Sequence, residues 1–376
     1  MEDGNIPAKV SDLDGSAPES TDFANYFCTY AYLYHQKDML EDHKRTGAYY
    51  AAIRQNRRQF EGKVVLDVGT GSGILAIFAA QAGAKTVYAV EATSMAKHAQ
   101  KLVEAHQLGH VIRVIQGVIE TVNIPEKVDI IISEWMGYFL LRESMLDSVL
   151  VARDKFLKPG GALYPSHARL YFAPIRSGQT QQRLADFQNS MGGWSNFLGD
   201  MQRFYGVNLD CLSDEFRQEQ QEYFMSTSAW ADVHPSQLLG PPACFKRYDL
   251  LTVTLAEIAA PLQESFSLEK YDPGTVDGFV GYFDVLFKGS QQNPADAEIL
   301  LSTAPDPTGA THWGQQSFTV WPAVECAPGD KIDCTISVSR RKDNHRLMDV
   351  ELKHHVKGPS ALAQHASARV SNYRIE

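Results

Sequence analysis

The sequence predicts an α/β domain built on a parallel sheet, followed by an antiparallel β domain that carries a helical arm. Three observations predict this. Short apolar runs alternate with helical stretches from residue 63 to 134, strand-like runs dominate after residue 175, and residues 176–205 have helical spacing. Strands that alternate with helices are typical of a parallel sheet, whereas successive strands separated by turns are typical of an antiparallel one. A length of 376 residues also favours two domains over one core.

The first half begins with residues 1–22, which are small, polar and acidic and are expected to form a disordered tail. Residues 23–60 place aromatic and charged side chains three or four apart, as helices do. The alternation that follows comprises KVVLDVG (63–69), ILAIFAAQAG (74–83), TVYAVE (86–91), SMAKHAQKLVEAHQLG (94–109), VIRVIQG (111–117) and KVDIIISE (127–134). KPGGALYPSHARLYFAPI (158–175) closes this half.

The second half contains five strand-like runs with turn-forming residues between them: YDLLTVTL, GYFDVLF, QSFTVWP, KIDCTISVS and MDVELKHHV. They predict an antiparallel sheet or barrel. The stretch 176–205 interrupts the pattern with an apolar stripe at helical spacing: Leu184, Phe187, Met191, Trp194, Leu198, Met201 and Tyr205. A stripe of this kind, if exposed, indicates an interface.

Charge and cysteine content narrow the possible partners. The net charge of −10 argues against non-specific nucleic-acid binding and favours a basic partner. No apolar segment is long enough to span a bilayer, and the first residues lack the apolar core of a secretory signal. The five scattered cysteines fit neither a disulfide framework nor a zinc site, so we expect no metal and reduced thiols, as in cytoplasm and nucleus.

The segment VVLDVGTGSGI predicts a nucleotide site, because a glycine-rich turn between a strand and a helix lets the backbone approach a ligand closely. The candidate cofactor-binding residues are Asp67, Gly69, Gly71 and Gly73, with Glu91 at the end of the next strand for the ribose hydroxyls. A tight turn without a ligand would explain two glycines alone, but not their coincidence with the strand, the helix and the acid.

The type of nucleotide follows from charge. The dinucleotide pattern expects a third glycine where Ile74 stands, and the loop is surrounded by Asp67, Glu120, Glu134 and Glu143. A group of carboxylates repels a pyrophosphate and attracts a sulfonium cation, which favours S-adenosylmethionine over a nicotinamide dinucleotide. Glu120 is placed to accept from an adenine amino group, although a solvated loop acid is nearly as plausible on spacing alone.

The segment SEWMGYFLLRESML (133–146) predicts the acceptor site. Glu134 follows a buried strand, and Glu143 lies beyond an apolar stretch that begins at Trp135. Buried carboxylates are unfavourable unless they meet a cation, and a guanidinium presents a planar fork of donors that suits two of them. Spacing alone is weak support, since two acids this close are common on surfaces.

These motifs resemble the protein arginine methyltransferases, and most closely the type I enzymes. The resemblance covers nearly the whole chain beyond the tail. It is carried by Tyr26-Phe27 with Tyr30, by His35, Met39 and Leu40, by Asp42 and Arg45, by VLDVGTGSGI, by the two glutamates, and by Thr311-His312-Trp313. It implies a Rossmann-like, S-adenosylmethionine-dependent domain over residues 23–165 and an antiparallel β-barrel domain over 166–376, with a helical dimerisation arm at 176–205.

The resemblance also implies residue roles. Glu134, Glu143, His312 and Asp42 would be catalytic, with the last two joining the domains and assisting proton removal. Arg45 would pair with the cofactor carboxylate, and His35, Met39 and Met145 would complete the cofactor site. Tyr26, Tyr30, Met136 and Trp313 would contact the acceptor.

The implied function is the formation of monomethyl- and asymmetric dimethylarginine on proteins such as histones or Arg/Gly-rich proteins, a role in chromatin regulation. A homodimer is implied as well, and the long 176–205 stretch departs from the usual pattern in a way that suits a plant-type enzyme with a long arm. A small-molecule methyltransferase and a non-catalytic, cofactor-binding scaffold are the alternatives. The first does not need paired glutamates, and intact Glu134, Glu143 and His312 argue against the second.

Overall fold

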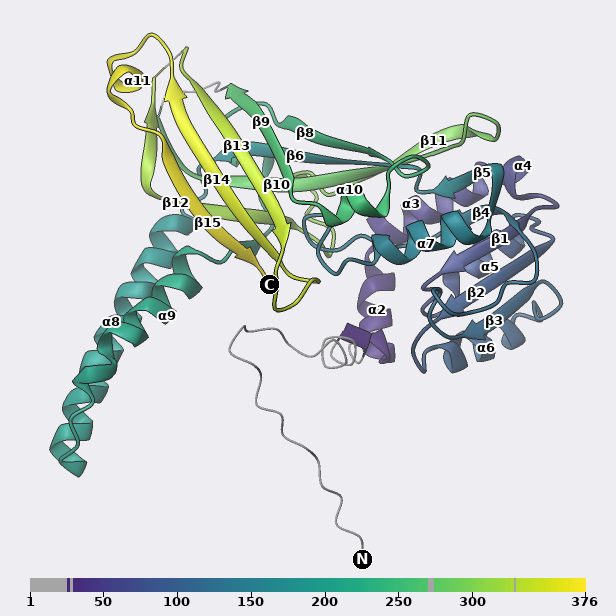
Figure 1. Ribbon diagram of the computed structural model, residues 1–376, viewed down its shortest axis with the longest axis horizontal. Helices are drawn as coiled ribbons and strands as arrows, with labels where there is room; N and C mark the ends of the chain where they lie inside the picture. Colours follow the sequence, from purple (N-terminus) through teal and green to yellow (C-terminus); the bar gives the residue numbers. More distant parts are fainter. Residues whose placement is uncertain (1–25, 28–29, 270–273, 328) are drawn as a thin grey trace, which may run out of the picture.

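The computed structural model describes residues 26–27, 30–269, 274–327 and 329–376. The predicted acidic tail, residues 1–22, lies outside the described residues. Within them, the chain forms a parallel-sheet domain, an antiparallel domain and a helical arm that extends away from the latter (Figure 1).

The first domain contains a five-stranded parallel sheet in the order β3-β2-β1-β4-β5. Every residue of β1 is buried, as expected for a sheet that helices cover on both faces. Its strands are β1 (Val64–Val68), β2 (Thr86–Glu91), β3 (Ile112–Gln116), β4 (Val128–Ile132) and β5 (Leu157–Tyr164). Its helices are α3 (His43–Arg54), α4 (Arg57–Phe60), α5 (Ile74–Gln81), α6 (Ala96–Ala105) and α7 (Leu146–Phe156). This is the predicted Rossmann-like arrangement.

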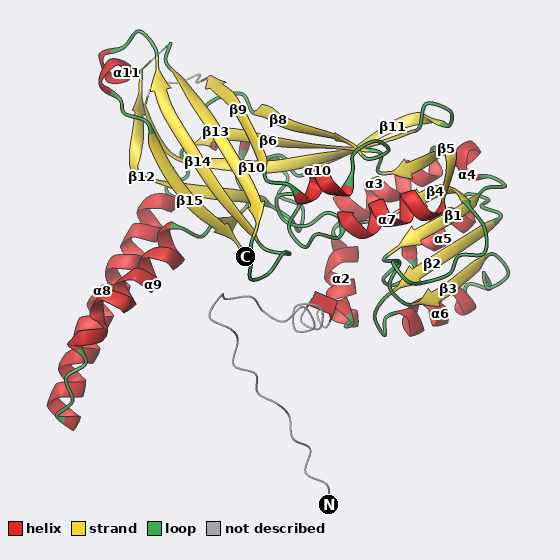
Figure 2. Ribbon diagram, in the orientation of Figure 1, coloured by secondary structure: helices red, strands yellow, loops and turns green. Residues whose placement is uncertain are grey.

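The N-terminal helical region is divided at Asp42. Helix α2 (Leu33–Glu41) ends there, and the Asp42 carboxylate accepts a hydrogen bond from the backbone N–H of Arg45 at 3.0 Å, which caps α3. An aspartate at this position satisfies one of the unpaired N–H groups of the first turn. The break turns α2 away from α3 and brings it to the edge of the parallel sheet (Figure 2).

The second domain consists of two antiparallel sheets. The larger follows the order β7-β12-β10-β6-β8, with β11 paired to β10, and the smaller the order β15-β14-β13-β9. The larger sheet contains β6 (His167–Ile175), β7 (Ala229–Ala231), β8 (Ala243–Asp249), β10 (Gly274–Gly289), β11 (Pro294–Ser302) and β12 (Gln315–Cys326). The smaller contains β9 (Leu262–Glu269), β13 (Lys331–Arg340), β14 (Met348–Lys357) and β15 (Arg369–Ile375).

The two sheets pack face to face through aromatic side chains. Phe172 of β6 lies 5.9 Å from Phe266 of β9 between ring centroids, and Phe245 of β8 lies 5.5 Å from Phe266. The strand pairing among the described residues therefore divides the predicted antiparallel domain into two sheets that pack against each other.

The arm is a helical hairpin. Helix α8 (Gln179–Tyr205) continues unbroken through Gly192 and Gly193, and α9 (Ser213–Met225) returns beside it. The predicted apolar stripe is half-buried at Trp194, whose ring stacks on Phe216 of α9 with centroids 4.3 Å apart. The sequence analysis missed α9, which covers part of that stripe. The free end still exposes Phe197, Phe204 and Tyr205, at 42%, 63% and 72%.

One predicted strand is wrong. The run YDLLTVTL leaves β8 at Asp249 and becomes a turn, after which Thr254 and Glu257 form a reciprocal cap at the start of α10 (Leu255–Ala259). The shorter elements are η1 (Asp210–Leu212), η2 (Pro235–Gln237) and α11 (Ala361–His365). Among the described helices, none has both the length and the apolar character needed to span a membrane.

The two domains share a continuous core. The chain passes from β5 to β6 between Tyr164 and His167, and the buried apolar cluster extends from Val65 of β1 to Phe318 of β12. Asn56, after α3, exchanges hydrogen bonds with the backbone of Ala297 in β11 at 2.9 and 2.8 Å. The shared core and these hydrogen bonds therefore join the two domains.

Candidate active site

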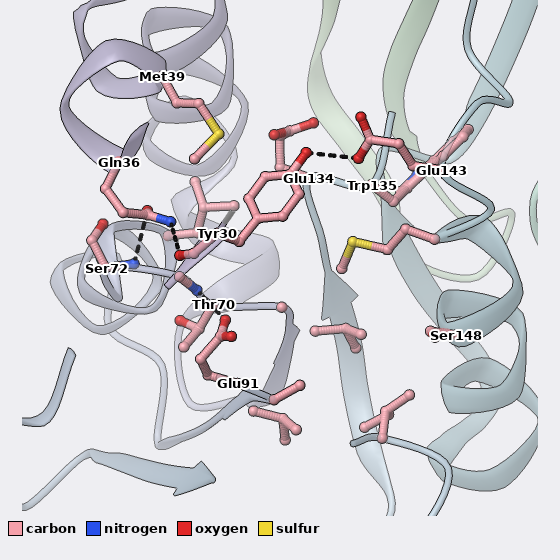
Figure 3. Close-up of a pocket in the computed structure, with 18 of the residues that line it drawn as sticks. Tyr30, Gln36, Met39, Thr70, Ser72, Glu91, Glu134, Trp135, Glu143 and Ser148 are labelled. Atoms are coloured by element: carbon pink, nitrogen blue, oxygen red, sulfur yellow. Dashed lines mark hydrogen bonds between the residues drawn. The ribbon is translucent and has the colours of Figure 1, made fainter. Parts of the chain in front are cut away.

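A cavity opens at the carboxyl edge of the parallel sheet, where nucleotides bind in folds of this class. Its wall combines the glycine loop after β1, helix α2, the end of β2 and the loop between β4 and α7. Figure 3 shows Glu91 at one end, Tyr30 in the middle, and Glu134 and Glu143 together at the other end. The cavity therefore has two parts, one at the glycine loop and one at the paired glutamates.

The glycine loop is shaped by backbone that other residues rarely adopt. Gly69 and Gly71 have φ of +70° and +54°, and a Cβ on Gly71 would lie 2.8 Å from Oε1 of Gln36. Glu91 holds the loop, since its carboxylate accepts from the N–H of Gly71 at 2.9 Å and from that of Thr93 at 2.8 Å. Each carboxylate oxygen retains a second lone pair, so Glu91 can also accept from a ligand.

Three residues predicted to bind the cofactor do not line this cavity. Asp67 is buried beneath the loop and accepts from the Thr70 hydroxyl at 2.6 Å, and burial raises the pKa of its carboxyl to about 7. Gly73 lies against Ala99 of α6, where it allows close packing of helices. His35 packs on Tyr34 instead, because the helical turn directs its neighbour Gln36 into the cavity. All three lie outside the described lining of the cavity, and their roles in cofactor binding stay predictions.

Gln36 is the residue that takes the position predicted for His35. It is buried, and its side-chain oxygen accepts from the N–H of Ser72 at 3.2 Å. Met39 and Met145 do line the cavity, as does Glu120, which accepts from the Ser148 hydroxyl at 2.6 Å. The helical spacing of residues 33–41 could have indicated Gln36, since positions 36 and 39 share a face.

At the other end, Glu134 follows β4 and is bound by Arg45 of α3. The Arg45 Nε and Nη2 atoms lie 3.1 and 2.5 Å from Oε2 of Glu134, and Arg45 Nη1 donates to the Met39 carbonyl at 2.8 Å. Oε1 of Glu134 is buried without a hydrogen-bond partner among the described residues. A buried carboxylate oxygen in this state indicates a donor that arrives from outside the chain.

Glu143 lies in the loop between β4 and α7, and its backbone φ is +81°. Its Oε2 accepts from the Tyr30 hydroxyl at 2.6 Å, and its Oε1 lies 3.2 Å from Nη1 of Arg142. Burial raises the pKa of Glu143, against the opposing effect of the Tyr30 hydrogen bond. Burial and the nearby Glu143 also raise the pKa of Tyr26 and of Tyr30, so both hydroxyls remain protonated donors.

His312 and Asp42 lie behind the cavity wall and connect the domains. Asp42 Oδ2 accepts from the backbone N–H of His312 at 2.9 Å and lies 2.8 Å from its Nδ1. Burial opposes ionisation of Asp42, but the hydrogen bonds from His312 and from the N–H of Arg45 outweigh it and lower its pKa to about 2. Since Asp42 also caps the helix that carries Arg45, the pair positions Arg45.

Trp313 also lies behind the wall. It is buried, and its Nε1 donates to the carbonyl of Met136 at 2.9 Å. The sequence analysis expected it to wall the acceptor channel, whereas the structure places Met136, together with Tyr26 and Tyr30, on that surface. Trp313 instead supports the loop from the far side.

Arg346 is a further lining residue that the sequence analysis did not name. It belongs to the loop between β13 and β14, and its Nη1 donates to the carbonyl of Glu143 at 2.6 Å. No local pattern marks it, since it lies 203 positions from Glu143 in the chain.

The lining fits a positively charged nucleoside. Four carboxylates, those of Glu91, Glu120, Glu134 and Glu143, meet two guanidinium groups among the described lining residues. The glycine loop leaves no room for a Cβ at Gly71, as is usual where backbone approaches a ligand. The described residues contain no cluster that could hold a metal ion. Fold and site together define an S-adenosylmethionine-dependent methyltransferase.

Comparison with known proteins identifies the family. The model of the arginine methyltransferase oligomerization subdomain matches residues 166–359, and that of ribosomal protein L11 methyltransferase matches residues 42–166. Protein arginine N-methyltransferase PRMT10 of Oryza sativa subsp. japonica is 51% identical over 333 residues, which cover 89% of this chain and 88% of the relative. PRMT10 of Arabidopsis thaliana is 50% identical over 362 residues, or 95% and 94% of the two chains.

Solved structures agree. The crystal structure of Arabidopsis thaliana protein arginine methyltransferase 10, described as uniquely open, matches with a TM-score of 0.90 at 48% identity, over 93% of this chain and 100% of that one. The Trypanosoma brucei PRMT1 enzyme-prozyme complex with AdoHcy matches with a TM-score of 0.76 at 30% identity, over the same shares. The chain belongs to the protein arginine N-methyltransferases, and its cofactor is S-adenosylmethionine.

Proposed function

We propose that the protein forms monomethylarginine and then asymmetric dimethylarginine on protein substrates. The observation that carries this is the pair of partly buried carboxylates at one end of the cavity: Oε1 of Glu134 has no hydrogen-bond partner among the described residues, and Glu143 accepts from Tyr30. Two carboxylates match the planar fork of a guanidinium. An ammonium is a compact point charge and does not need two separated acceptors.

The roles of the residues follow from the chemistry of the acceptor. A guanidinium is a poor nucleophile because its lone pairs are delocalised. Glu134 and Glu143 hold the positive charge on the far nitrogens, which leaves electron density on the nitrogen that faces the glycine-loop end. S-adenosylmethionine, when bound, supplies an electrophilic methyl group there. Orientation of the two reactants contributes roughly 7–11 kcal/mol in favourable cases.

The acceptor nitrogen must also lose a proton. The carboxylates of Glu134 and Glu143 are the nearest bases, and the His312–Asp42 pair behind Arg45 is the second candidate to receive the proton. In the described structure Arg45 binds Glu134, whereas the family resemblance assigns it to the cofactor carboxylate. Nε and Nη2 of Arg45 bind Glu134, and Nη1 binds the Met39 carbonyl. Arg45 can therefore give up one of these contacts to bind the cofactor carboxylate and keep the other.

Dimethylation of one nitrogen needs space for the first methyl group while the second arrives. Met39 lines the cavity, and its flexible thioether can move aside where a rigid ring could not. This supports asymmetric dimethylarginine as the product. Arg/Gly-rich proteins and histone tails are the substrates that the acidic chain favours, since both are basic. Histones would require a nuclear pool of the enzyme beside a cytoplasmic one.

We propose that the active form is a homodimer. The matched subdomain is described as an oligomerization subdomain, and the free end of the arm exposes three aromatic side chains. Exposed apolar patches of this kind usually mark an interface. The partner's cofactor domain is the proposed docking surface for the arm.

The function is tested with labelled S-adenosylmethionine and a glycine-rich peptide that contains arginine, beside the same peptide with lysine in its place. Label on the arginine peptide alone is expected, and amino-acid analysis should find monomethylarginine early and asymmetric dimethylarginine late. Label on the lysine peptide, or on small molecules only, would contradict the proposal. Symmetric dimethylarginine would overturn the product assignment alone.

A further inference from the structure

The loop Arg341–Leu347, between β13 and β14, reaches from the antiparallel domain to the acceptor end of the cavity. The backbones of Arg346 and Glu143 are joined by a hydrogen bond from the N–H of Glu143 to the Arg346 carbonyl, at 2.8 Å. In addition, Nη1 of Arg346 donates to the Glu143 carbonyl at 2.6 Å, and the Ser144 hydroxyl donates to the backbone carbonyl of His345 at 2.8 Å. The backbone of Glu143 is therefore held on both its N–H and its carbonyl.

The Arg346 guanidinium is also connected to the carboxylate of Glu143 indirectly, through the side chains of Tyr26 and Tyr30. The Arg346 Cζ lies 4.0 Å from the ring centroid of Tyr26, and that ring lies 5.2 Å from the ring of Tyr30. The Tyr30 hydroxyl donates to Glu143 Oε2 at 2.6 Å (Figure 3). Arg346, Tyr26, Tyr30 and Glu143 thus form a closed set of contacts around one carboxylate.

The acceptor loop needs such support because its backbone is strained. Phe139, Leu140, Glu143 and Ser144 all have positive φ, between 50° and 81°, which residues other than glycine rarely adopt. Backbone of this kind persists only where its surroundings fix it. At the base of the same hairpin, Arg340 forms a two-point ion pair with Asp147 of α7, with both N–O distances 2.7 Å. The antiparallel domain therefore holds both the acceptor loop, at Glu143 and Ser144, and the helix that follows it, at Asp147.

We propose that Arg346 is a positioning residue for the methyl transfer: it fixes the backbone of Glu143 and the tyrosines that orient the carboxylate of Glu143. This inference rests on the proposed function, since it assigns Glu143 to the acceptor guanidinium. The contacts of Arg346 with Glu143, Tyr26 and Phe27 all lie at the acceptor end of the cavity.

The test compares Arg346→Met, which keeps the length of the side chain but removes its donors and charge, with Arg346→Lys. Lysine can donate to the Glu143 carbonyl or lie over Tyr26, but it lacks the planar fork that does both. Lys342→Met is the matched control, because Lys342 is an exposed cation on the same loop. Turnover of the arginine peptide is measured at saturating cofactor, and calorimetry gives the affinity for S-adenosylhomocysteine.

Arg346→Met should lower kcat by about 10²-fold, the loss typical of a reactant group displaced by about 1 Å. Affinity for S-adenosylhomocysteine should stay within about twofold, Arg346→Lys should recover part of the rate, and Lys342→Met should match the wild type. In a Glu143→Gln background, Arg346→Met should add little further loss, because residues that act as a unit are not additive.

Three results would overturn the role of Arg346. The first is wild-type turnover in Arg346→Met. The second is a double variant, Arg346→Met with Glu143→Gln, whose loss of rate equals the product of the two single losses. The third is a fall in cofactor affinity in Arg346→Met that is large enough to account for the lost rate. If Arg346→Met does not fold, the same readouts on Arg346→Lys decide, and wild-type kinetics there would overturn the role. A wild-type protein that methylated neither peptide would instead overturn the proposed function, and this role with it.

Discussion

Glu143 and Glu91 are both acidic residues of one cavity, yet they lie at opposite ends of it and have different partners (Figure 3). Glu91 accepts hydrogen bonds from the N–H of Gly71 in the glycine loop and from that of Thr93, whereas Glu143 accepts from Tyr30 and has a raised pKa because it is buried. The two carboxylates should therefore fail in different ways when they are changed.

Glu143→Gln keeps the shape of the side chain but removes its charge. Loss of one such preoriented electrostatic contact typically lowers a rate by roughly 10²–10³-fold. We expect kcat to fall by this factor while affinity for S-adenosylhomocysteine stays nearly constant. Glu91→Ala should do the reverse, with weaker cofactor binding as the primary defect. Calorimetry and a rate assay at saturating cofactor separate them, and normal turnover of Glu143→Gln would refute the two-glutamate site.

The pH dependence tests the hydrogen bond between Tyr30 and Glu143. Burial raises the pKa of Glu143, and the Tyr30 hydroxyl opposes that rise because it stabilises the ionised form. The carboxylate must be ionised to bind a guanidinium, so activity should fall as pH falls through this pKa. Tyr30→Phe removes the opposing hydrogen bond, so the acid limb of kcat/KM should move to higher pH. A limb that stays in place, or moves to lower pH, would show that Tyr30 does not act on this carboxylate.

At the scale of elements, the arm is the least attached part of the molecule. Thr180 is the one residue of α8 that is buried in the described chain, and α8 otherwise rests on α9. The hairpin extends away from the antiparallel domain (Figure 1), and its free end carries the exposed Phe197, Phe204 and Tyr205. This arrangement makes the arm suitable for a partner and of little use to the subunit alone.

We expect Phe197→Ser, Phe204→Ser and Tyr205→Ser in combination to give monomers with little activity, because these side chains supply the apolar area of the arm tip. The α8–α9 contact at Trp194 and Phe216 is left intact, so the helices should remain, and circular dichroism would verify this. Trp321→Ser changes an equally exposed aromatic on β12 and serves as control. Sedimentation measures the assembly, and a fully active triple variant that sediments as a monomer would contradict the proposed dimer.

Elements differ in how far the sequence could predict them. Strands β1 and β2 follow from short apolar runs bounded by glycine or a charged residue, and their positions were correct to within one or two residues. Helix α9 was predictable in principle, since Phe216, Gln220 and Phe224 share a face, but its polar surface concealed it. In YDLLTVTL, Thr254 with Glu257 three residues later is a capping-box pattern that indicates the start of a helix. The apolar residues of the run favoured a strand instead, and the prediction followed them.

The active site shows where sequence reasoning ends. The glycine loop and Glu134 are recognisable because they follow strands, and Glu91 because it ends one, since strands of a parallel sheet end at one edge. Glu143 is recognisable from the apolar stretch that separates it from Glu134. Local sequence also misplaced His35, since one residue of rotation decides which side chain of a helix enters a cavity. Arg346 and the exact position of Trp313 depend on contacts between domains, for which no spacing rule exists.

At the scale of the molecule, the Asp42–His312 pair joins the domains. Its folded-state pKa of about 2 lies below the value of about 3.9 for an unfolded aspartate, so the pair stabilises the fold above about pH 4 and loses this effect as pH falls toward 2. Asp42→Asn keeps the cap of α3 but removes the charge. The variant should unfold at a lower temperature than the wild type at pH 7, and the difference should shrink near pH 3. A difference that is independent of pH would show that the charge is unimportant.

The order of synthesis gives the hairpin at Arg341–Leu347 a further consequence. The glycine loop and the double-glutamate loop leave the ribosome early, whereas β14 and its partner β15, which complete the hairpin and its sheet, come last. At a synthesis rate of roughly 5–20 residues per second, the segment that fixes Glu143 is made on the order of tens of seconds after Glu143 itself. Glu143 therefore gains its contacts with Arg346 only after residues 341–347 have been synthesised.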